Sequence, residues 1–147
     1  MDFLIRSLRA SGGRAGIDYH MRAVLDPVRR KLLVGKGQIY IHDVGPRSWH
    51  TRRTLSTTGG DPIVKSIYPG LAYDPDRDRI VAWNGGNTVY RLDLETRVWT
   101  PITYPSGPGP AVQDGTYKRW SYSRTSGVFV VVNSVDSDAY VLRLPPP

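Results

Sequence analysis

The chain of 147 residues contains no cysteine. Disulfides, thiolate metal sites and cysteine nucleophiles are therefore excluded. No apolar run approaches the roughly 20 residues that span a bilayer. The apolar run at residues 3–5 is too short for the core of a signal peptide, and Arg6 interrupts it. We expect no membrane segment and no export signal, with the cytoplasm as the default location.

Residues that hold metals or phosphate are scarce. The three histidines, His20, His42 and His50, have no second histidine or carboxylate at the spacing of a zinc site. No serine stands in a nucleophile-elbow pattern, and no glycine-rich loop precedes a helix that could hold phosphate. Asp74 begins an alternation of aspartates that is typical of a calcium loop, but the sixth and twelfth positions carry arginine and glycine. We predict no metal site and no cofactor.

Basic residues outnumber acidic residues. The formal net charge is +7, from 20 Lys+Arg against 13 Asp+Glu. The basic residues are spread along the chain, which is typical of solvated strand surfaces. We therefore do not expect a nucleic-acid partner, although an acidic ligand stays possible.

The chain is rich in turn-forming residues and contains a repeat. It has 15 glycines and 12 prolines, which suits many short strands. Leu25 aligns with Tyr73, 48 residues later (73 − 25), and Trp49 aligns with Trp99, 50 residues later (99 − 49). A looser third copy starts at Tyr122. A period near 50 residues is typical of four-stranded propeller blades.

Each copy predicts the same succession of strands. First strands are expected at residues 22–25, 71–73 and 120–122, and nearly continuously apolar second strands at residues 31–35, 79–83 and 128–132. Asp-Pro turns follow the first strand in two copies, and glycine-containing hairpins follow the second strand. Third strands alternate, with Tyr90, Leu92 and Leu94 on one face.

The ends of the chain suggest a shared blade. Residues 3–8 resemble a fourth strand without its three partners, although a short helix over the same residues is the competing interpretation. Residues 145–147 are prolines at the place where a fourth strand would begin. We therefore expect one all-β domain, a partial propeller of about three four-stranded antiparallel blades with permuted ends. Its parts would be an outer strand at residues 1–14, blades at 15–60 and 61–108, and three inner strands at 109–147.

Three blades are too few to close a ring, because propellers carry about 4–8. We predict a homodimer with two-fold symmetry and six blades, in which residues 3–8 of each chain complete the last blade of the other. The alternative is that the chain is a piece of a longer propeller.

The second copy resembles the Kelch-type blade of the galactose-oxidase-like propellers. The resemblance is carried by Tyr73-Asp74, Gly85-Gly86, Tyr90 and Trp99. The first copy keeps Tyr40 and Trp49 without the glycine pair, and the third copy lacks both the glycine pair and the tryptophan. The resemblance implies a propeller fold but no single activity. The copper oxidase activity of the founding members needs a cysteine cross-linked to tyrosine, so it is not implied.

The loops that enter the first strands would ring one mouth of the propeller channel, which is the usual binding face. The expected binding residues there are aromatic or cationic: His20, Arg22, Lys65, Tyr68, Tyr117, Lys118, Arg119 and Trp120. They suit a carbohydrate, an acidic polymer or a protein. The competing interpretation is that these aromatics pack between blades. We predict a non-catalytic binding module, and the alternative is a carbohydrate-active hydrolase or lyase with its active site in the channel.

Overall fold

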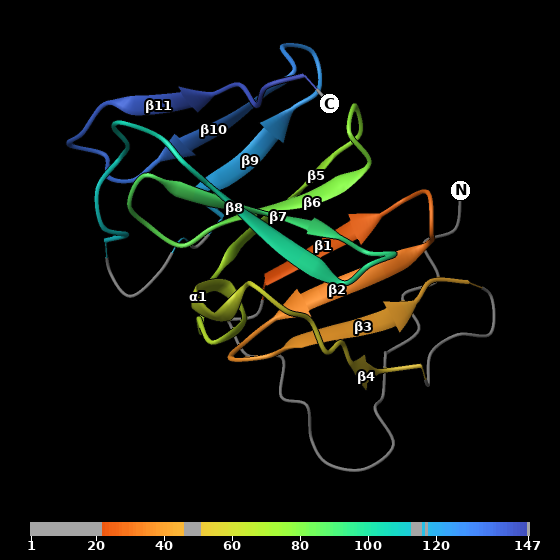
Figure 1. Ribbon diagram of the computed structural model, residues 1–147. Coiled ribbons are helices and arrows are strands. Elements are labelled where there is room, and N and C mark those ends of the chain that lie inside the picture. The colour runs from red at the N-terminus through yellow and green to blue at the C-terminus, as the bar shows by residue number, and fades with distance from the viewer. Residues whose placement is uncertain (1–21, 46–50, 113–115, 117, 147) are drawn as a thin grey trace.

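The computed structural model describes residues 22–45, 51–112, 116 and 118–146. This part of the chain is all-β with one short helix, and its strands form three antiparallel sheets (Figure 1). The first sheet contains β1 (Arg22–Asp26), β2 (Lys31–Gly35), β3 (Ile39–Asp43) and β4 (Arg53–Thr54). The second contains β5 (Gly70–Asp74), β6 (Arg79–Trp83), β7 (Thr88–Asp93) and β8 (Val98–Thr103). The third contains β9 (Trp120–Ser123), β10 (Val128–Val132) and β11 (Ala139–Leu142).

The three sheets repeat one pairing pattern. The predicted second strands coincide with β2, β6 and β10. Equivalent residues of the second and third strands lie opposite each other in every sheet: Leu32 and His42, Ile80 and Leu92, Phe129 and Leu142. The internal repeat inferred from the sequence is therefore confirmed, pair by pair, for three strands of each copy.

The Asp-Pro turns have a shared physical basis. Each aspartate, Asp26 or Asp74, is fully buried, and its carboxylate accepts hydrogen bonds from the backbone N–H groups two and three residues later. The turn then closes with a positive φ, 53° at Arg30 and 51° at Asp78. These side-chain bonds replace the backbone partners that a reversing chain loses, so the hairpins are locally determined.

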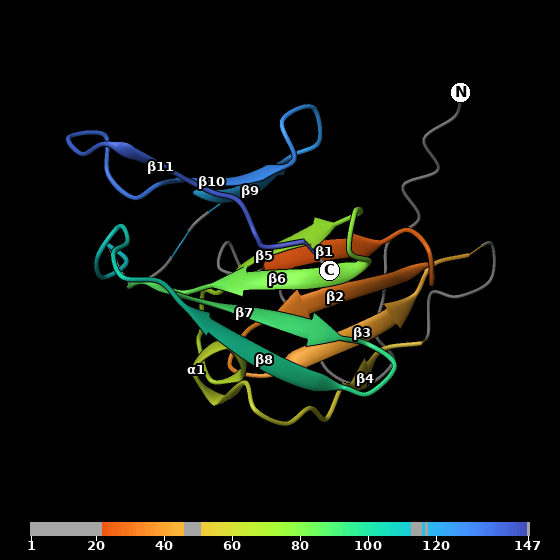
Figure 2. The same cartoon turned by 45° about the horizontal axis from the view of Figure 1, so that its top comes forward.

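The first strands of the three sheets are neighbours. β5 lies beside both β1 and β9, while the later strands of each sheet lie farther out (Figures 1 and 2). One core forms between the first and second sheets, where Leu33 and Ile41 share a cluster with Leu92. A second core forms between the second and third sheets, where Val81 shares a cluster with Phe129. The second sheet is thus covered on both faces, which explains why β6 is almost entirely apolar.

The alignment of Trp49 with Trp99 is wrong. Trp99 lies opposite Leu92, and Thr100 lies opposite Arg91. In the first sheet Arg53 lies opposite Ile41, so the same register assigns the position of Trp99 to Arg52. The connection between the third and fourth strands is longer in the first copy than in the second, which displaces the fourth strand along the sequence. Trp49 itself lies outside the described residues.

A short helix, α1 (Asp61–Val64), was not expected between the first two sheets. It follows Gly60, with an aspartate in its first turn and a proline near its start, which are ordinary helix-start signals. Its Ile63 is fully buried in the first core. In the part of the chain described by the structure, no helix has the length and apolar character needed to cross a membrane.

The third sheet differs from the other two at its outer edge. β11 pairs with β10, and no strand among the described residues pairs with its other edge. Tyr140 is 40% exposed there and Val141 is 66% exposed. All-β character and three antiparallel sheets are therefore confirmed, while the described residues of this single chain form no closed ring.

Candidate functional site

The connections that enter β5 and β9 lie together, at the end of the sheets where the channel mouth was predicted. The carbonyl oxygen of Tyr68 accepts hydrogen bonds from the backbone N–H and the hydroxyl of Thr116, at 3.2 and 3.1 Å. Thr116 is fully buried, and Tyr68 is half-buried. These contacts join the two predicted binding loops.

Three of the predicted binding residues have side chains that reach solvent. Lys65 follows α1 and forms a mostly exposed ion pair with Asp61. Lys118 is exposed and has a positive φ of 69°. Tyr68 is half-buried. His20 and Tyr117 lie outside the described residues, so the complete ring of eight residues stays a prediction.

Two other predicted binding residues are buried. Trp120 is 5% exposed and stacks on Phe129, with ring centroids 4.8 Å apart and planes 9° apart. Its indole N–H donates to the carbonyl oxygen of Val81 on the second sheet at 3.1 Å. Arg22 is 8% exposed at the start of β1. Trp120 therefore packs between sheets, as the competing interpretation expected for an aromatic residue at this position.

Arg119 holds neighbouring loops. Its guanidinium donates to the backbone carbonyl oxygens of Thr116, Val112 and Asn133 at 3.0, 2.6 and 2.9 Å. Asn133 is itself 5% exposed, and its amide donates to the carbonyl oxygens of two prolines in residues 108–110. Asn133 could not be singled out from the sequence, because an asparagine after a strand is an ordinary turn residue.

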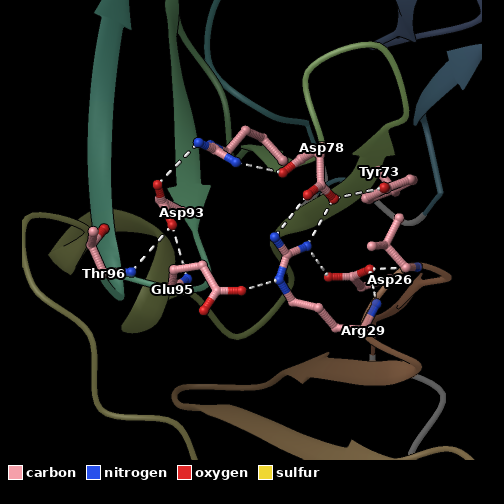
Figure 3. Close-up of polar contacts among 9 residues, drawn as sticks. Asp26, Arg29, Tyr73, Asp78, Asp93, Glu95 and Thr96 are labelled. Atoms are coloured by element: carbon pink, nitrogen blue, oxygen red, sulfur yellow. Dashed lines mark hydrogen bonds and ion pairs between the residues drawn. The ribbon is translucent and has the colours of Figure 1, made fainter.

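A charged network lies at the opposite end of the sheets, among the turns (Figure 3). The guanidinium of Arg29 donates to both carboxylate oxygens of Asp78, at 2.8 and 2.7 Å, and to Glu95 at 2.7 Å. It also donates to the buried Asp26 at 2.9 Å. The hydrogen bonds to Asp78, and then the one to Glu95, raise the pKa of Arg29 above its ordinary value. Since Arg29 belongs to the first sheet's turn and its partners Asp78 and Glu95 belong to the second sheet, this network connects two sheets.

The next junction repeats this arrangement with different acceptors. Arg77 occupies the position of Arg29 and donates to Asp74, its own turn aspartate, at 3.0 Å. It also donates to the carbonyl oxygens of Leu144 and Pro145 beyond β11, at 2.8 and 2.9 Å. One arginine per turn thus attaches each of the first two sheets to the chain that follows.

Carboxylates in these turns are held ionised by their partners. The pKa of Asp78 is lowered, chiefly by the hydrogen bonds from Arg29, and that of Asp93 chiefly by the backbone N–H of Thr96. Hydrogen bonds from Arg53, and then from Lys31, lower the pKa of Asp43 to about 2. These acids are paired with cations or with turn backbone, and each pairing stabilises the charged form.

Tyrosine and histidine pKa values are moved by burial. Burial, and then the hydrogen bond to Asp78, raises the pKa of Tyr73 to about 12. Burial lowers the pKa of His42, and the charge of Arg52 lowers it further. His42 is half-buried and lies opposite Leu32. Among the described residues, no three histidine or acidic side chains are placed to hold a metal ion.

A polar groove lies on the outer part of the second sheet, on the face turned toward the third. It has a volume of about 420 Å³. Its lining consists of three arginines, one aspartate and three residues from the β7–β8 hairpin: Arg77, Arg79, Arg91, Asp93, Thr96, Val98 and Thr100. The sequence did not indicate this groove, because its members come from three strands and two turns and become neighbours only by pairing.

Comparisons of the chain with protein-family models, with curated proteins and with solved structures give no match in any of the three.

Proposed function

We propose that the chain is a non-catalytic binding module that assembles as a homodimer into a six-bladed, Kelch-like propeller. The observation that carries the proposal concerns the outward faces of the first and third sheets, which lie on either side of the second sheet. Each has one face buried against the second sheet, and its other face lies outside the two described cores. Both open faces carry exposed apolar side chains, which favour association in water.

The outward, or open, face of the first sheet is equivalent to the face of the second sheet that is buried against the first sheet. It carries Leu25, which is 47% exposed, and Leu32, which lies opposite it. The equivalent pair in the second sheet, Tyr73 and Ile80, packs in the core against the first sheet. The open face is thus of the type that packs onto a preceding sheet.

The open face of the third sheet is of the complementary type. It carries Val130, opposite the 66% exposed Val141, and Val132, which is 41% exposed. The residue equivalent to Val130 is Val81, which is fully buried against the third sheet. In a two-fold dimer, the third sheet of each chain would pack on the first sheet of the other, and both junctions would resemble those within one chain.

The unpaired edge of β11 supports the same assembly. β8 occupies the corresponding edge in the second sheet and brings the buried Trp99 opposite Leu92. A strand from residues 3–8 of the second chain would satisfy the free N–H and C=O groups of β11.

The recognition surface in this proposal is the channel mouth. Lys65, Tyr68 and Lys118 are the described residues that present cationic or aromatic side chains there. Each would occur twice in the dimer, which suits an extended acidic or carbohydrate ligand. Binding is favoured over hydrolase or lyase activity because the described carboxylates with lowered pKa are engaged in ion pairs or turns rather than free in the channel.

The assembly is tested by light scattering on the full chain and on two variants. Val141→Asp would place a carboxylate in the proposed interface, at a cost of about 3 kcal/mol or more for a buried unpaired charge. Val135→Asp introduces the same charge at a position that is 94% exposed and serves as the control. We expect a dimer for the parent and Val135→Asp, and a monomer for Val141→Asp at micromolar concentration. A monomeric parent chain would refute the assembly.

The ligand is tested separately, by measuring binding to an acidic polysaccharide and to its neutral counterpart. Lys65→Gln combined with Lys118→Gln should weaken binding to the acidic polymer only. Equal binding before and after the substitutions would reject the channel mouth as the recognition surface.

A further inference from the structure

The polar groove on the second sheet contains more positive than negative charge. Three guanidinium groups line it, from Arg77, Arg79 and Arg91, together with the single carboxylate of Asp93. Arg77 also contacts the buried carboxylate of Asp74. Three guanidinium groups and two carboxylates therefore give this region a net charge of one positive unit.

Two of these arginines are held in place. Arg79 donates to the carbonyl oxygen of Asp78 at 2.8 Å and forms an ion pair with Asp93 at 3.1 Å. Arg77 is held by the carbonyl oxygens beyond β11. Their side-chain positions are set before any ligand arrives, which reduces the entropy lost on binding.

Arg91 is different. It lies in the middle of β7 and is half-buried, and its guanidinium makes no hydrogen bond or ion pair with any residue that the structure describes. Its neighbour across the strand pair is Thr100, and Thr96 lies in the following turn, so two hydroxyl groups lie in the same groove. The guanidinium carries five N–H donors, and it is exposed enough for a ligand in the groove to reach them.

In the first sheet, the position equivalent to Arg91 is occupied by an apolar residue, so the packing of the repeat does not require a cation at this position. The residue equivalent to Arg91 is Ile41, which is 5% exposed and packs in the first core. The equivalents of Arg79 and Asp93, Lys31 and Asp43, also form an ion pair, and their side chains remain 28% and 32% exposed beneath the complete second sheet. An added fourth strand on the third sheet would therefore leave the Arg79–Asp93 part of the groove partly open, whereas Arg91, the equivalent of the 5% exposed Ile41, would become more enclosed.

We propose that the groove binds the oxyanionic group of a small polar molecule, a carboxylate, sulfate or phosphate, with Arg91 as the residue that contacts it. The guanidinium would donate two parallel hydrogen bonds to the oxyanion. Arg79 and Arg77 supply positive potential from fixed positions, and the hydroxyls of Thr96 and Thr100 add neutral donors. All residues that line the groove belong to one chain and lie outside the channel mouth, so anion binding does not require the proposed dimer.

The test is a titration of the full chain followed by two-dimensional NMR, in a chloride buffer without other oxyanions. The probes are inorganic phosphate, sulfate and D-glucuronate, with D-glucose as the neutral control. We expect saturable shifts of the Arg91 side-chain N–H and of Thr96 and Thr100 with at least one anion, and none with glucose. The comparison among the three anions identifies which group the site prefers.

Three variants decide the assignment. Arg91→Gln should weaken binding at least about tenfold, since hydrogen bonds to ionised groups contribute roughly that much or more. Arg91→Lys, which keeps the charge but loses the paired donors, should give an intermediate affinity. Arg124→Gln removes the same charge from an exposed turn outside the groove and should leave the affinity unchanged.

The outcomes distinguish specific anion binding in the groove from nonspecific electrostatic attraction of anions to a basic protein. Equal affinity in Arg91→Gln and the parent, equal weakening by Arg124→Gln, or no saturation with any anion would each overturn the proposal. Repeating the titration on Val141→Asp keeps the two proposals apart, because a monomeric variant with intact binding supports the groove whatever the assembly.

Discussion

Arg29 and Asp78 form a two-bond ion pair between the turns of the first and second sheets. The Nη1–Oδ1 distance is 2.8 Å and the Nη2–Oδ2 distance is 2.7 Å. The same guanidinium neutralises Asp26, whose carboxylate is fully buried. Arg29 therefore has two roles. It connects the first and second sheets, and it balances the charge of Asp26, whose carboxylate shapes the first turn.

Arg29→Ala should lower the free energy of unfolding by about 1–3 kcal/mol, because Asp26 would lose its cation while remaining buried. Part of the lost interaction is with Asp78 and Glu95, which are more exposed and contribute less. Urea unfolding followed by tryptophan fluorescence measures the change. Arg124→Ala, in an exposed turn, is the matched control and should shift the midpoint little. Equal midpoints for both variants would contradict the role given to Arg29.

The hairpins could be predicted from the sequence because their determinants are local. An Asp-Pro turn, an apolar run and an alternating strand lie within about 20 residues of each other, and the observed β2, β6 and β10 match the predicted ranges. The fourth strand of the first sheet could not be placed, since its register depends on a loop rather than on a pattern. A tryptophan in the right region was a weaker signal than the pairing of Arg53 with Ile41.

The site was harder to predict than the fold. Trp120 was expected to contact a ligand, but it is enclosed by Phe129 and Trp83, an environment made by residues far apart in the chain. Arg91 gave no signal, because arginine in an alternating strand is ordinary on a solvated face. What distinguishes it is the buried Ile41 at the equivalent position, and that comparison requires the register of both sheets.

Acidification should destabilise the fold in a defined window. The pKa values of Asp43, Asp78 and Asp93 are lowered from an ordinary value of 3.8, that of Asp43 to about 2. Depressed carboxyl pKa values contribute stability that is fully present above about pH 5 and is lost as the pH falls through the folded-state values. The urea midpoint should therefore fall between pH 5 and about pH 2. Asp43→Asn should show a shallower decline, and a midpoint independent of pH would exclude these pairs as contributors.

Asn133→Asp tests the buried amide that holds the loop before β9. The Asn133 side chain donates to the carbonyl oxygens of Pro108 and Pro110 at 3.0 and 2.8 Å and accepts from the N–H of Val112 at 3.3 Å. A carboxylate would place an oxygen against two carbonyls, at a cost of about 2–4 kcal/mol. Because a buried carboxyl is favoured in its protonated form, the deficit should be larger at pH 7 than at pH 4. Asn87→Asp is the control for burial, because the Asn87 amide also donates to a carbonyl oxygen, that of Tyr104, but lies at an exposed position. A deficit of the same size in both variants would contradict the account.

Gly60→Ala tests the packing of Trp99 at the junction of the first two sheets. A Cβ atom at Gly60 would lie 2.2 Å from Cδ1 of the Trp99 indole, although the backbone there, at φ −121°, accepts any residue. The ring is 2% exposed and its Nε1 donates to Thr57 at 3.0 Å, so it has little freedom to move. Overpacking of this kind costs about 1–3 kcal/mol or more, and it should also change the tryptophan fluorescence of the folded state.

Gly37→Ala supplies the contrast, because Gly37 has a positive φ of 65° and no atom within 4 Å of the added carbon. Its cost of about 1 kcal/mol would come from backbone strain alone and leave the fluorescence unchanged. If the two variants have the same unfolding midpoint and the same spectrum, the indole is not held against Gly60 as the structure indicates.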